Sequence, residues 1–334
     1  MNAPRAPDLL ERVRTLASRN DHAGVVRLLE GWTRDALLAD PELGYHAAYA
    51  WRRTGRTLEA LDLVERLDVI VRRRADAWLI RRRLNLEAML RFDAGDLPAA
   101  EQLWWQVVEL ADRDGDRALL AAAHNNVGVI QTLHDRTDDA LATYNRALLA
   151  SQQLGDRRGV AQAHQNLAIL YREKERPVES EAHFVEAMQH ARISHSEDVL
   201  GRAEEERALL LLDQGDVTLA RAAAARALDR LRAIEDVNGA GEALRVLGMV
   251  ALRDRALEQA ADYLDHAIRH AREVHNPLLE AETEEALAAL ALATGDSDRA
   301  RRHQADAERR FDVLSAEPWG RRVRERTLQR AGVT

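Results

Sequence analysis

The sequence predicts an all-α protein, built as a right-handed superhelical solenoid of paired helices. Small residues recur every 40 positions in two columns, and good helix N-cap residues recur with the same spacing. Only 4% of the residues are aromatic, while alanine, leucine, arginine and glutamate abound, as expected of helices that pack through small side chains. Because a repeat array has no single central core, a length of 334 residues does not imply several domains.

The two columns of small residues mark the points where paired helices are expected to cross. The first column comprises Ala60, Ala100, Ala140, Ser180, Ala220, Ala260 and Ala300. The second column lies 12 residues earlier and comprises Ala48, Ala88, Gly128, Ala168, Ala208, Gly248 and Ala288. Small side chains allow two helix backbones to approach closely. Each 40-residue unit is therefore predicted to be a hairpin of two helices.

Turn and cap residues separate these predicted helices. Glycine followed by aspartate at 95–96, 215–216 and 295–296 is typical of a helix end followed by a new N-cap. Junctions between hairpins are marked by a further column, Asp76, Asp116, Asp156, Ser196, Asp236 and Asn276. Larger residues that we expect to fill the space between hairpins also recur every 40 positions, namely Val64, Trp104, Tyr144, Phe184 and Leu264.

These columns resemble the tetratricopeptide repeat, in which Leu-Gly, Tyr, Ala, an aromatic residue and Ala recur in order. The best matches are Val127-Gly128, Ala140, Tyr144 and Ala147, followed in the next unit by Leu167-Ala168, Tyr171, Ser180, Phe184 and Ala187. The family period is about 34 residues, so the second helix of each unit is expected to be longer here. The chain most resembles the long-repeat branch that includes kinesin light chain and the Pins-type adaptors.

We predict a single solenoid over residues 1–334, with about seven to eight hairpins and a C-terminal capping helix. Residues 1–40 are expected to form an N-terminal capping hairpin that turns at Asn20-Asp21, and residues 41–316 to form seven repeats. Pro318 is expected to stop the last helix of the array. The remaining segment, 317–334, contains a short basic stretch that is predicted to cap the C-terminal end.

Charge and motif content exclude several classes of function. A net charge of −8 gives no reason to expect nucleic-acid or membrane partners, and no stretch approaches the roughly 18 apolar residues of a membrane span. The lack of cysteine and of an apolar N-terminal segment fits a cytoplasmic protein. No nucleotide, hydrolase or metal motif is present, so we expect no enzyme activity, catalytic residue, metal or cofactor.

The first helices of such a solenoid line its concave face. The resemblance implies that an asparagine at the sixth position of a unit pairs with a bound peptide backbone, and Asn126 and Asn166 match that position. Amide side chains both donate and accept, which suits an extended main chain. The predicted partner-binding residues are Tyr45, Tyr49, Arg82, Asn85, Asn125, Asn126, Gln162, Gln165, Asn166, Arg172, Arg202 and Arg245.

The arginines in this set favour an acidic or amphipathic partner segment. In an alternative interpretation, the asparagines only satisfy neighbouring helices and most of the arginines are solvated. The first functional hypothesis is an adaptor that binds a peptide or a helix of a protein partner in the groove. The second is a regulatory sensor, similar to the repeat domains of quorum-sensing or transcription regulators, whose superhelix responds to a peptide or small ligand. Homo-oligomers through the terminal repeats are a further possibility.

Overall fold

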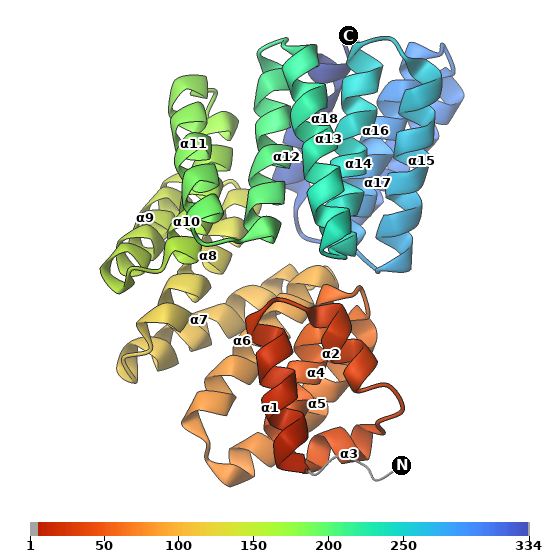
Figure 1. Ribbon diagram of the computed structural model, residues 1–334. Helices are drawn as coiled ribbons and strands as arrows, with labels where there is room; N and C mark the ends of the chain where they lie inside the picture. The colour runs from red at the N-terminus through yellow and green to blue at the C-terminus, as the bar shows by residue number, and fades with distance from the viewer. Residues whose placement is uncertain (1–5, 333–334) are drawn as a thin grey trace.

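The computed structural model describes residues 6–332, which form eighteen α-helices and contain no β-strand (Figure 1). The predicted all-α class is therefore confirmed. The first five and the last two residues, which belong to the predicted caps 1–40 and 317–334, lie outside the described residues. None of the helices in the described part is long and apolar enough to cross a lipid bilayer.

Seven helical hairpins follow one another and form the body of the solenoid (Figure 1). Their helices are α4 (Pro41–Arg53) with α5 (Thr57–Arg74), α6 (Ala77–Asp93) with α7 (Leu97–Arg113), α8 (Arg117–Leu133) with α9 (Thr137–Leu154), α10 (Arg157–Glu173) with α11 (Pro177–Ile193), α12 (Glu197–Asp213) with α13 (Val217–Ala233), α14 (Val237–Arg253) with α15 (Leu257–Glu273), and α16 (Pro277–Ala293) with α17 (Ser297–Val313). Neighbouring helices pack in sequence order, as the 40-residue period predicts.

From the second repeat onwards, the two helices of a repeat share the length of the unit almost equally, whereas the first repeat combines α4 of 13 residues with α5 of 18. In the third repeat, for example, α8 has 17 residues and α9 has 18, and in the sixth repeat both α14 and α15 have 17. The length of these repeats is therefore not concentrated in the second helix. Because both helices keep the same number of turns, the crossing points stay in register from one repeat to the next.

Local side-chain chemistry sets the ends of the helices. The carboxylates of Asp116, Asp156 and Asp236 accept a hydrogen bond from the backbone N–H three residues later, as N-caps do. Ser196 lies in the same column but makes no such bond, because its hydroxyl pairs with that of Ser194 at 2.9 Å. Gly95 has a φ of +86°, a left-handed conformation that glycine adopts at little cost.

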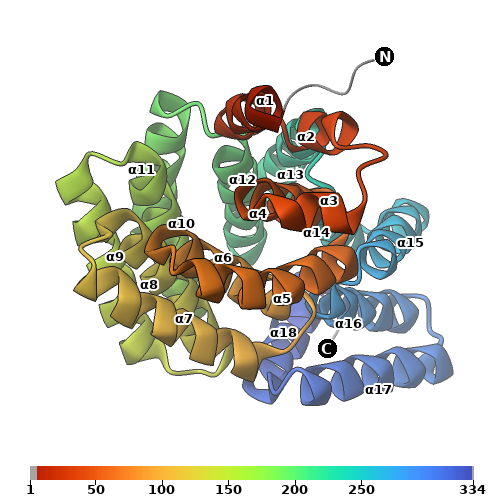
Figure 2. The same cartoon turned by 90° about the horizontal axis from the view of Figure 1, so that it is seen from below.

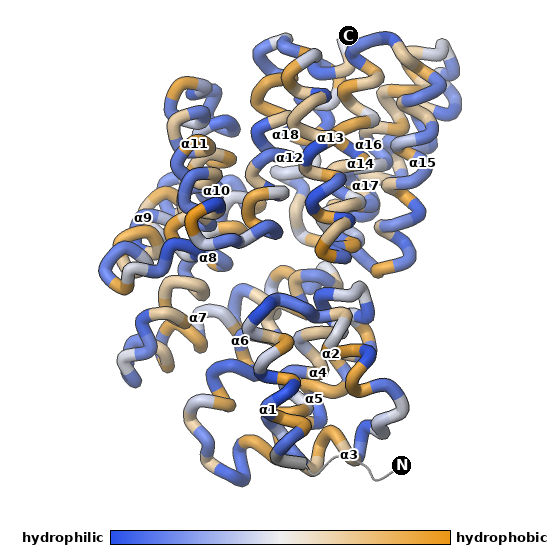
Figure 3. Tube along the Cα trace, viewed as in Figure 1, coloured by the Kyte–Doolittle hydropathy of each residue, from blue (hydrophilic) through white to orange (hydrophobic). Residues whose placement is uncertain are grey.

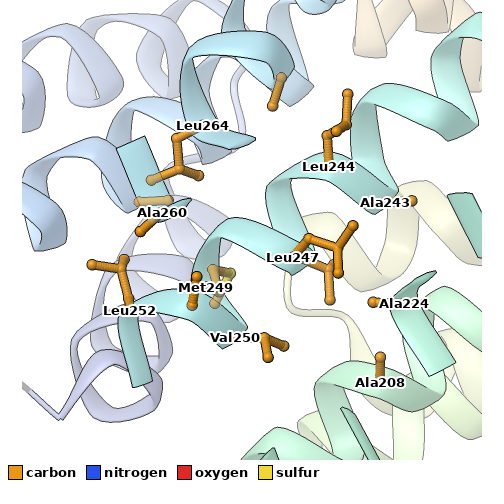
Figure 4. Packing of buried hydrophobic residues seen from close by; sticks show 14 of the residues in the cluster. Ala208, Ala224, Ala243, Leu244, Leu247, Met249, Val250, Leu252, Ala260 and Leu264 are labelled. Carbon is orange, nitrogen blue, oxygen red and sulfur yellow. The ribbon is translucent and has the colours of Figure 1, made fainter. Parts of the chain in front are cut away.

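The apolar core runs between the hairpins instead of gathering at one centre. Hydrophobic and hydrophilic segments alternate along the helices (Figure 3). In the largest buried cluster, Leu247 and Val250 of α14 lie beside Ala224 of α13 and Ala208 of α12 (Figure 4). A Cβ added at Gly128 would lie only 2.4 Å from the Tyr144 ring. Small residues in the predicted columns therefore allow the large residues of the paired helix to reach the backbone.

The N-terminal region folds differently from the expected hairpin. It forms three helices, α1 (Ala6–Ser18), α2 (His22–Leu28) and α3 (Arg34–Ala39). All three pack against α4. The turn at Asn20-Asp21 is present, with Asn20 at a φ of +57° and Asp21 capping α2. Gly31, with a φ of +81°, and Thr33, which caps α3, divide what was expected to be one helix into two.

The last helix, α18 (Glu317–Ala331), turns back along the solenoid. Pro318 sits in its first turn, where the missing N–H of proline costs nothing, so this residue starts a helix instead of stopping one. The helix packs against α14, α16 and α17 and also reaches α8. The predicted C-terminal capping helix is confirmed, and it covers first helices of the array.

The superhelix winds until its first hairpin meets the fifth and sixth (Figure 2). Arg53 at the end of α4 pairs with Asp236, the N-cap of α14, at 3.1 Å and with Asp198 of α12 at 3.8 Å. A Cβ added at Gly55 would lie 2.7 Å from Val274, which follows α15. Residues far apart in the sequence thus join the first repeat to later ones and close one turn of the superhelix into a ring.

Three arginines of α18, spaced one helical turn apart, complete this closure. Arg322 donates to the carbonyl oxygen of Thr132 at 2.7 Å, and Arg326 donates to those of Arg172 and Glu173 at 3.2 and 3.1 Å. Arg330 pairs with Asp213 at 2.6 Å. Each arginine therefore meets the C-terminal end of a different first helix, where a positive charge is favoured by the helix dipole.

Replacing Arg326 with alanine is expected to lower the free energy of unfolding by about 2 kcal/mol, because the end of α10 loses its charged donor. Thermal unfolding followed by circular dichroism measures this change. The matched control is Arg321→Ala, which removes an exposed arginine of the same helix. Equal melting temperatures for the two variants would contradict the proposed role of the arginine series.

Candidate ligand-binding cavity

The first helices enclose a cavity of about 280 Å³ inside the ring. Its walls come from α4, α6, α8, α10, α12, α14 and α16, with Tyr144 of α9 and Trp319 of α18 completing the lining. Apolar contacts are provided by Phe92, Val129, Ile169 and Leu278. Every repeat therefore contributes to one shared space, as expected when first helices form the inner wall of a superhelix.

The cavity crosses the first helices obliquely. It meets the last turn of α4 at Arg52 and Arg53 and the last turn of α6 at Phe92 and Asp93. On α10 it meets the middle of the helix, and on α14 and α16 it meets residues at the N-terminal end and in the first turns, such as Asn238. Because each hairpin is displaced along the superhelix, the residues that line the cavity lie closer to the N-terminal end of the first helix in each successive repeat. Equivalent positions of different repeats therefore do not all face the same space.

Four of the twelve predicted partner-binding residues line this cavity: Gln165, Asn166, Arg202 and Arg245. The other eight lie elsewhere, namely Tyr45, Tyr49, Arg82, Asn85, Asn125, Asn126, Gln162 and Arg172. Asn126 and Asn166 occupy equivalent positions, yet only Asn166 reaches the cavity, since α8 is met nearer its C-terminal end. The oblique path explains this division.

Several of these eight residues make contacts within the protein. Asn85 accepts a hydrogen bond from the indole nitrogen of Trp104 at 3.1 Å, and the buried Asn125 accepts one from Asn166 at 3.4 Å. The ring of Tyr45 lies 6.1 Å from that of Trp78. Arg172 adjoins a separate small cavity of about 50 Å³ beside α18.

The arginines of the cavity are already neutralised by the protein's own carboxylates. Arg52 pairs with Asp93 at 2.6 Å and Arg245 with Glu282 at 3.1 Å. Arg202 pairs with Asp236 at 3.2 Å. In total the lining contains four arginines and six carboxylates, Asp93, Glu205, Glu206, Asp236, Glu242 and Glu282. The arginines are therefore occupied by the protein's own carboxylates, which leaves none of them free for the expected acidic partner segment.

Burial perturbs the surplus carboxylates. Desolvation raises the pKa of Glu242 to about 7, and the negative charges of Asp236 and Glu206 add to this effect while Arg202 opposes it. Desolvation also raises the pKa of Glu205 well above its usual range, with Glu206 and Glu242 contributing repulsion. Both side chains thus hold protons at a pH where exposed glutamates are ionised.

The sequence contained a signal for these missed residues. Arg202 and Glu242 stand 40 positions apart, as do Glu205 and Arg245, so opposite charges occupy equivalent positions of adjacent repeats. Equivalent positions on stacked first helices are neighbours in space, and Arg202 indeed contacts Glu242 at 3.5 Å. Comparing charge between repeats, in addition to residue size, would have predicted the pair of Arg202 with Glu242 but not the pair of Arg245, which forms with Glu282 and not with Glu205.

The seven hairpins and their enclosed cavity define an α-α superhelical repeat protein. The tetratricopeptide repeat family matches residues 135–193, a stretch that contains the motif residues Ala140, Tyr144 and Phe184. The matched stretch therefore consists of tetratricopeptide repeats, and the hairpins outside it share its 40-residue geometry. This confirms the resemblance seen in the sequence.

Solved structures with this fold differ widely in sequence from the chain. A Rap protein complexed with Competence and Sporulation Factor has a TM-score of 0.67 at 14% identity and covers 98% of each chain. NprR in complex with its cognate peptide NprX has a TM-score of 0.61 at 15% identity, covering 91% of this chain and 87% of NprR. Aspartyl phosphate phosphatase F from Bacillus subtilis has a TM-score of 0.54 at 13% identity, covering 100% and 98%. No curated protein matches the sequence.

Proposed function

We propose that the protein binds a short extended peptide, or an extended segment of a protein partner, inside the ring of first helices. The observation that carries this proposal is the cavity of about 280 Å³ to which all seven first helices contribute. Its amide side chains, Gln165, Asn166, Asn238 and Asn276, offer donors and acceptors to a peptide backbone. NprR, which has a similar fold, was crystallised with a cognate peptide.

The polar lining of the cavity favours an extended ligand over a helical one. An α-helix pairs its backbone N–H and C=O groups internally, so it would leave the amide side chains of the cavity without backbone partners. An extended peptide needs to insert only one or two side chains at a time, and its backbone groups then find partners among the amides.

The proposed contacts include four residues predicted from the sequence, Gln165, Asn166, Arg202 and Arg245. Catalysis is not proposed, although the fold is compatible with it, since a phosphatase shares the architecture. The chain contains no recognisable catalytic motif, and binding requires only the cavity. The predicted lack of nucleic-acid and membrane partners, the cytoplasmic location and association through the terminal repeats stay predictions.

Filling the cavity tests the proposal. The full chain is immobilised and used to select from a phage library of random seven-residue peptides, with Ile169→Trp as the filled variant. The matched control is Val178→Trp, at a position of α11 that is 79% exposed. We expect peptides that are enriched on the wild type to lose binding at least tenfold on Ile169→Trp and to keep it on Val178→Trp. No enrichment on the wild type, or equal binding to all three proteins, would reject the proposal.

A regulatory sensor is the second candidate, and the closure of the ring favours it. The cavity is lined both by early repeats, through Arg53 and Phe92, and by late repeats, through Asp236 and Leu278. A ligand that touches both sides changes the free energy of closure, because it binds the open and closed rings differently. Small-angle scattering with an enriched peptide should then reveal a changed radius of gyration. An unchanged radius would favour a passive adaptor.

A further inference from the structure

Four glutamates gather on one wall of the cavity. Glu205 and Glu206 lie on α12, Glu242 lies on α14 and Glu282 lies on α16. Three of them have arginine partners: Glu206 pairs with Arg172 at 2.9 Å, and Glu242 and Glu282 pair with Arg202 and Arg245. The wall is thus an alternating array of charges with a surplus on the negative side.

Glu205 is the member of this cluster without a partner. Its side chain lines the cavity, the residue is only 2% exposed, and its Oε1 has no hydrogen-bond partner among the described residues. A buried acceptor left unpaired costs about 1–3 kcal/mol, and more when it is charged. Buried polar groups are nearly always hydrogen-bonded, so this acceptor calls for a partner, and it faces a cavity of ligand size.

The surplus remains when the surrounding arginines are included. Five carboxylates, those of the four glutamates and Asp236, face four arginines at positions 53, 172, 202 and 245. Two of these arginines are shared with carboxylates outside the cluster, because Arg53 also contacts Asp198 and Arg172 also contacts Glu173. When all five carboxylates are ionised, one additional positive charge would therefore balance the wall.

The side chains indicate an organic cation. Across residues 6–332 no group of three or more histidines or carboxylates is arranged to hold a metal ion. An ammonium or guanidinium group donates several hydrogen bonds to separate carboxylates without demanding a fixed coordination geometry. Trp319 lines the same cavity, but Arg322 already lies over its ring at 5.4 Å from the centroid, so the carboxylates provide the recognition of the cation.

We propose that this wall is a subsite for a positively charged group of the peptide ligand, either a lysine or arginine side chain or a free N-terminal amine. The inference rests on the proposed function, since it assigns the chemistry of the ligand for that cavity. The cation pairs with Glu205 and Glu242, and the protons that these glutamates hold in the empty cavity are released on binding. Affinity should therefore rise with pH across the range in which the glutamates of the empty cavity titrate.

The peptide selection tests the subsite separately from the proposed function. Sequences enriched on the wild type should share a lysine or arginine at one position, or require an unblocked N-terminus. On the double variant Glu205→Gln/Glu242→Gln this preference should disappear. The control is Glu109→Gln, at an exposed position of α7, and it should leave the preference unchanged. Enriched peptides without any shared basic group would overturn the subsite while leaving the binding function intact.

Calorimetry supplies the quantitative test. An enriched peptide should bind the wild type at least tenfold more tightly than its analogue with citrulline or norleucine in place of the basic residue, or with an acetylated N-terminus. Binding should release protons, which is measured by repeating the titration in buffers of different ionisation enthalpy. Equal affinities, or no proton release, would contradict the proposal.

If no peptide is enriched, the proposed function fails but the subsite is still decided by a small probe. L-arginine amide should raise the melting temperature of the wild type more than L-citrulline amide does, and the double variant should not distinguish the two compounds. Circular dichroism checks that the variant folds. An equal response of the wild type to both compounds would overturn the subsite.

Discussion

Replacing Arg172 with leucine is expected to lower the free energy of unfolding by about 3–5 kcal/mol. The side chain is only 4% exposed and pairs with Glu206 at 2.9 Å and Glu173 at 3.2 Å. The side chain of Glu173 is itself only 3% exposed. Without the guanidinium, the buried carboxylate of Glu173 keeps only Arg326 as a partner, at 3.4 Å, and this loss outweighs the apolar contacts that leucine adds.

Denaturant unfolding followed by circular dichroism measures the loss. Arg176→Leu in the same repeat is the matched control, because Arg176 is 52% exposed and pairs with Glu179 at the surface. A surface pair of this kind contributes about 0–1 kcal/mol. If the two variants lose similar stability, the carboxylates around Arg172 have other partners and this residue is not structural. The expected result would mean that Arg172 stabilises the fold and does not contact a ligand, in contrast to the partner-binding role predicted from the sequence.

The variant Glu242→Gln is expected to be more stable than the wild type at alkaline pH. Burial raises the pKa of Glu242 from 4.5 to about 7, so between these values the folded state binds more protons than the unfolded state. Stability from this group is complete below pH 4.5 and is lost as the pH rises through 7. A shift of this size corresponds to about 3 kcal/mol, which glutamine, having no charge, does not lose.

At pH 8 the variant should therefore exceed the wild type by about 2–3 kcal/mol, and near pH 4.5 the two should be equal. Unfolding curves measured across this pH range provide the comparison. Glu109→Gln, which changes an exposed residue of α7, should follow the wild type at every pH. A pH-independent difference for Glu242→Gln would contradict the prediction, because it would mean that water or a neighbouring cation already stabilises the ionised side chain.

The cavity was predicted less completely than the fold. Sequence reasoning selected the same positions of every first helix, and this placed Gln165 and Asn166 correctly on the inner wall but not Asn126. It could not detect that the contact moves along successive helices, because this depends on the displacement between hairpins. It also treated Arg202 and Arg245 as free to bind a ligand, whereas each pairs with a carboxylate of the next repeat.

The sequence alone determined the number of repeats, the pairing of helices and most helix ends. These features depend on interactions between residues close in the chain, such as Asp116 capping the backbone three residues later. They also depend on the recurring small residues, such as Gly128, which can be read directly from the sequence. Only the tertiary structure decided the closure of the ring, the reversal of α18 and the charge of the cavity. Arg53 and Asp236 are 183 residues apart, and the 40-residue period of the sequence does not reveal such a pair. The two residues meet only because the rotations between all the intervening hairpins add up.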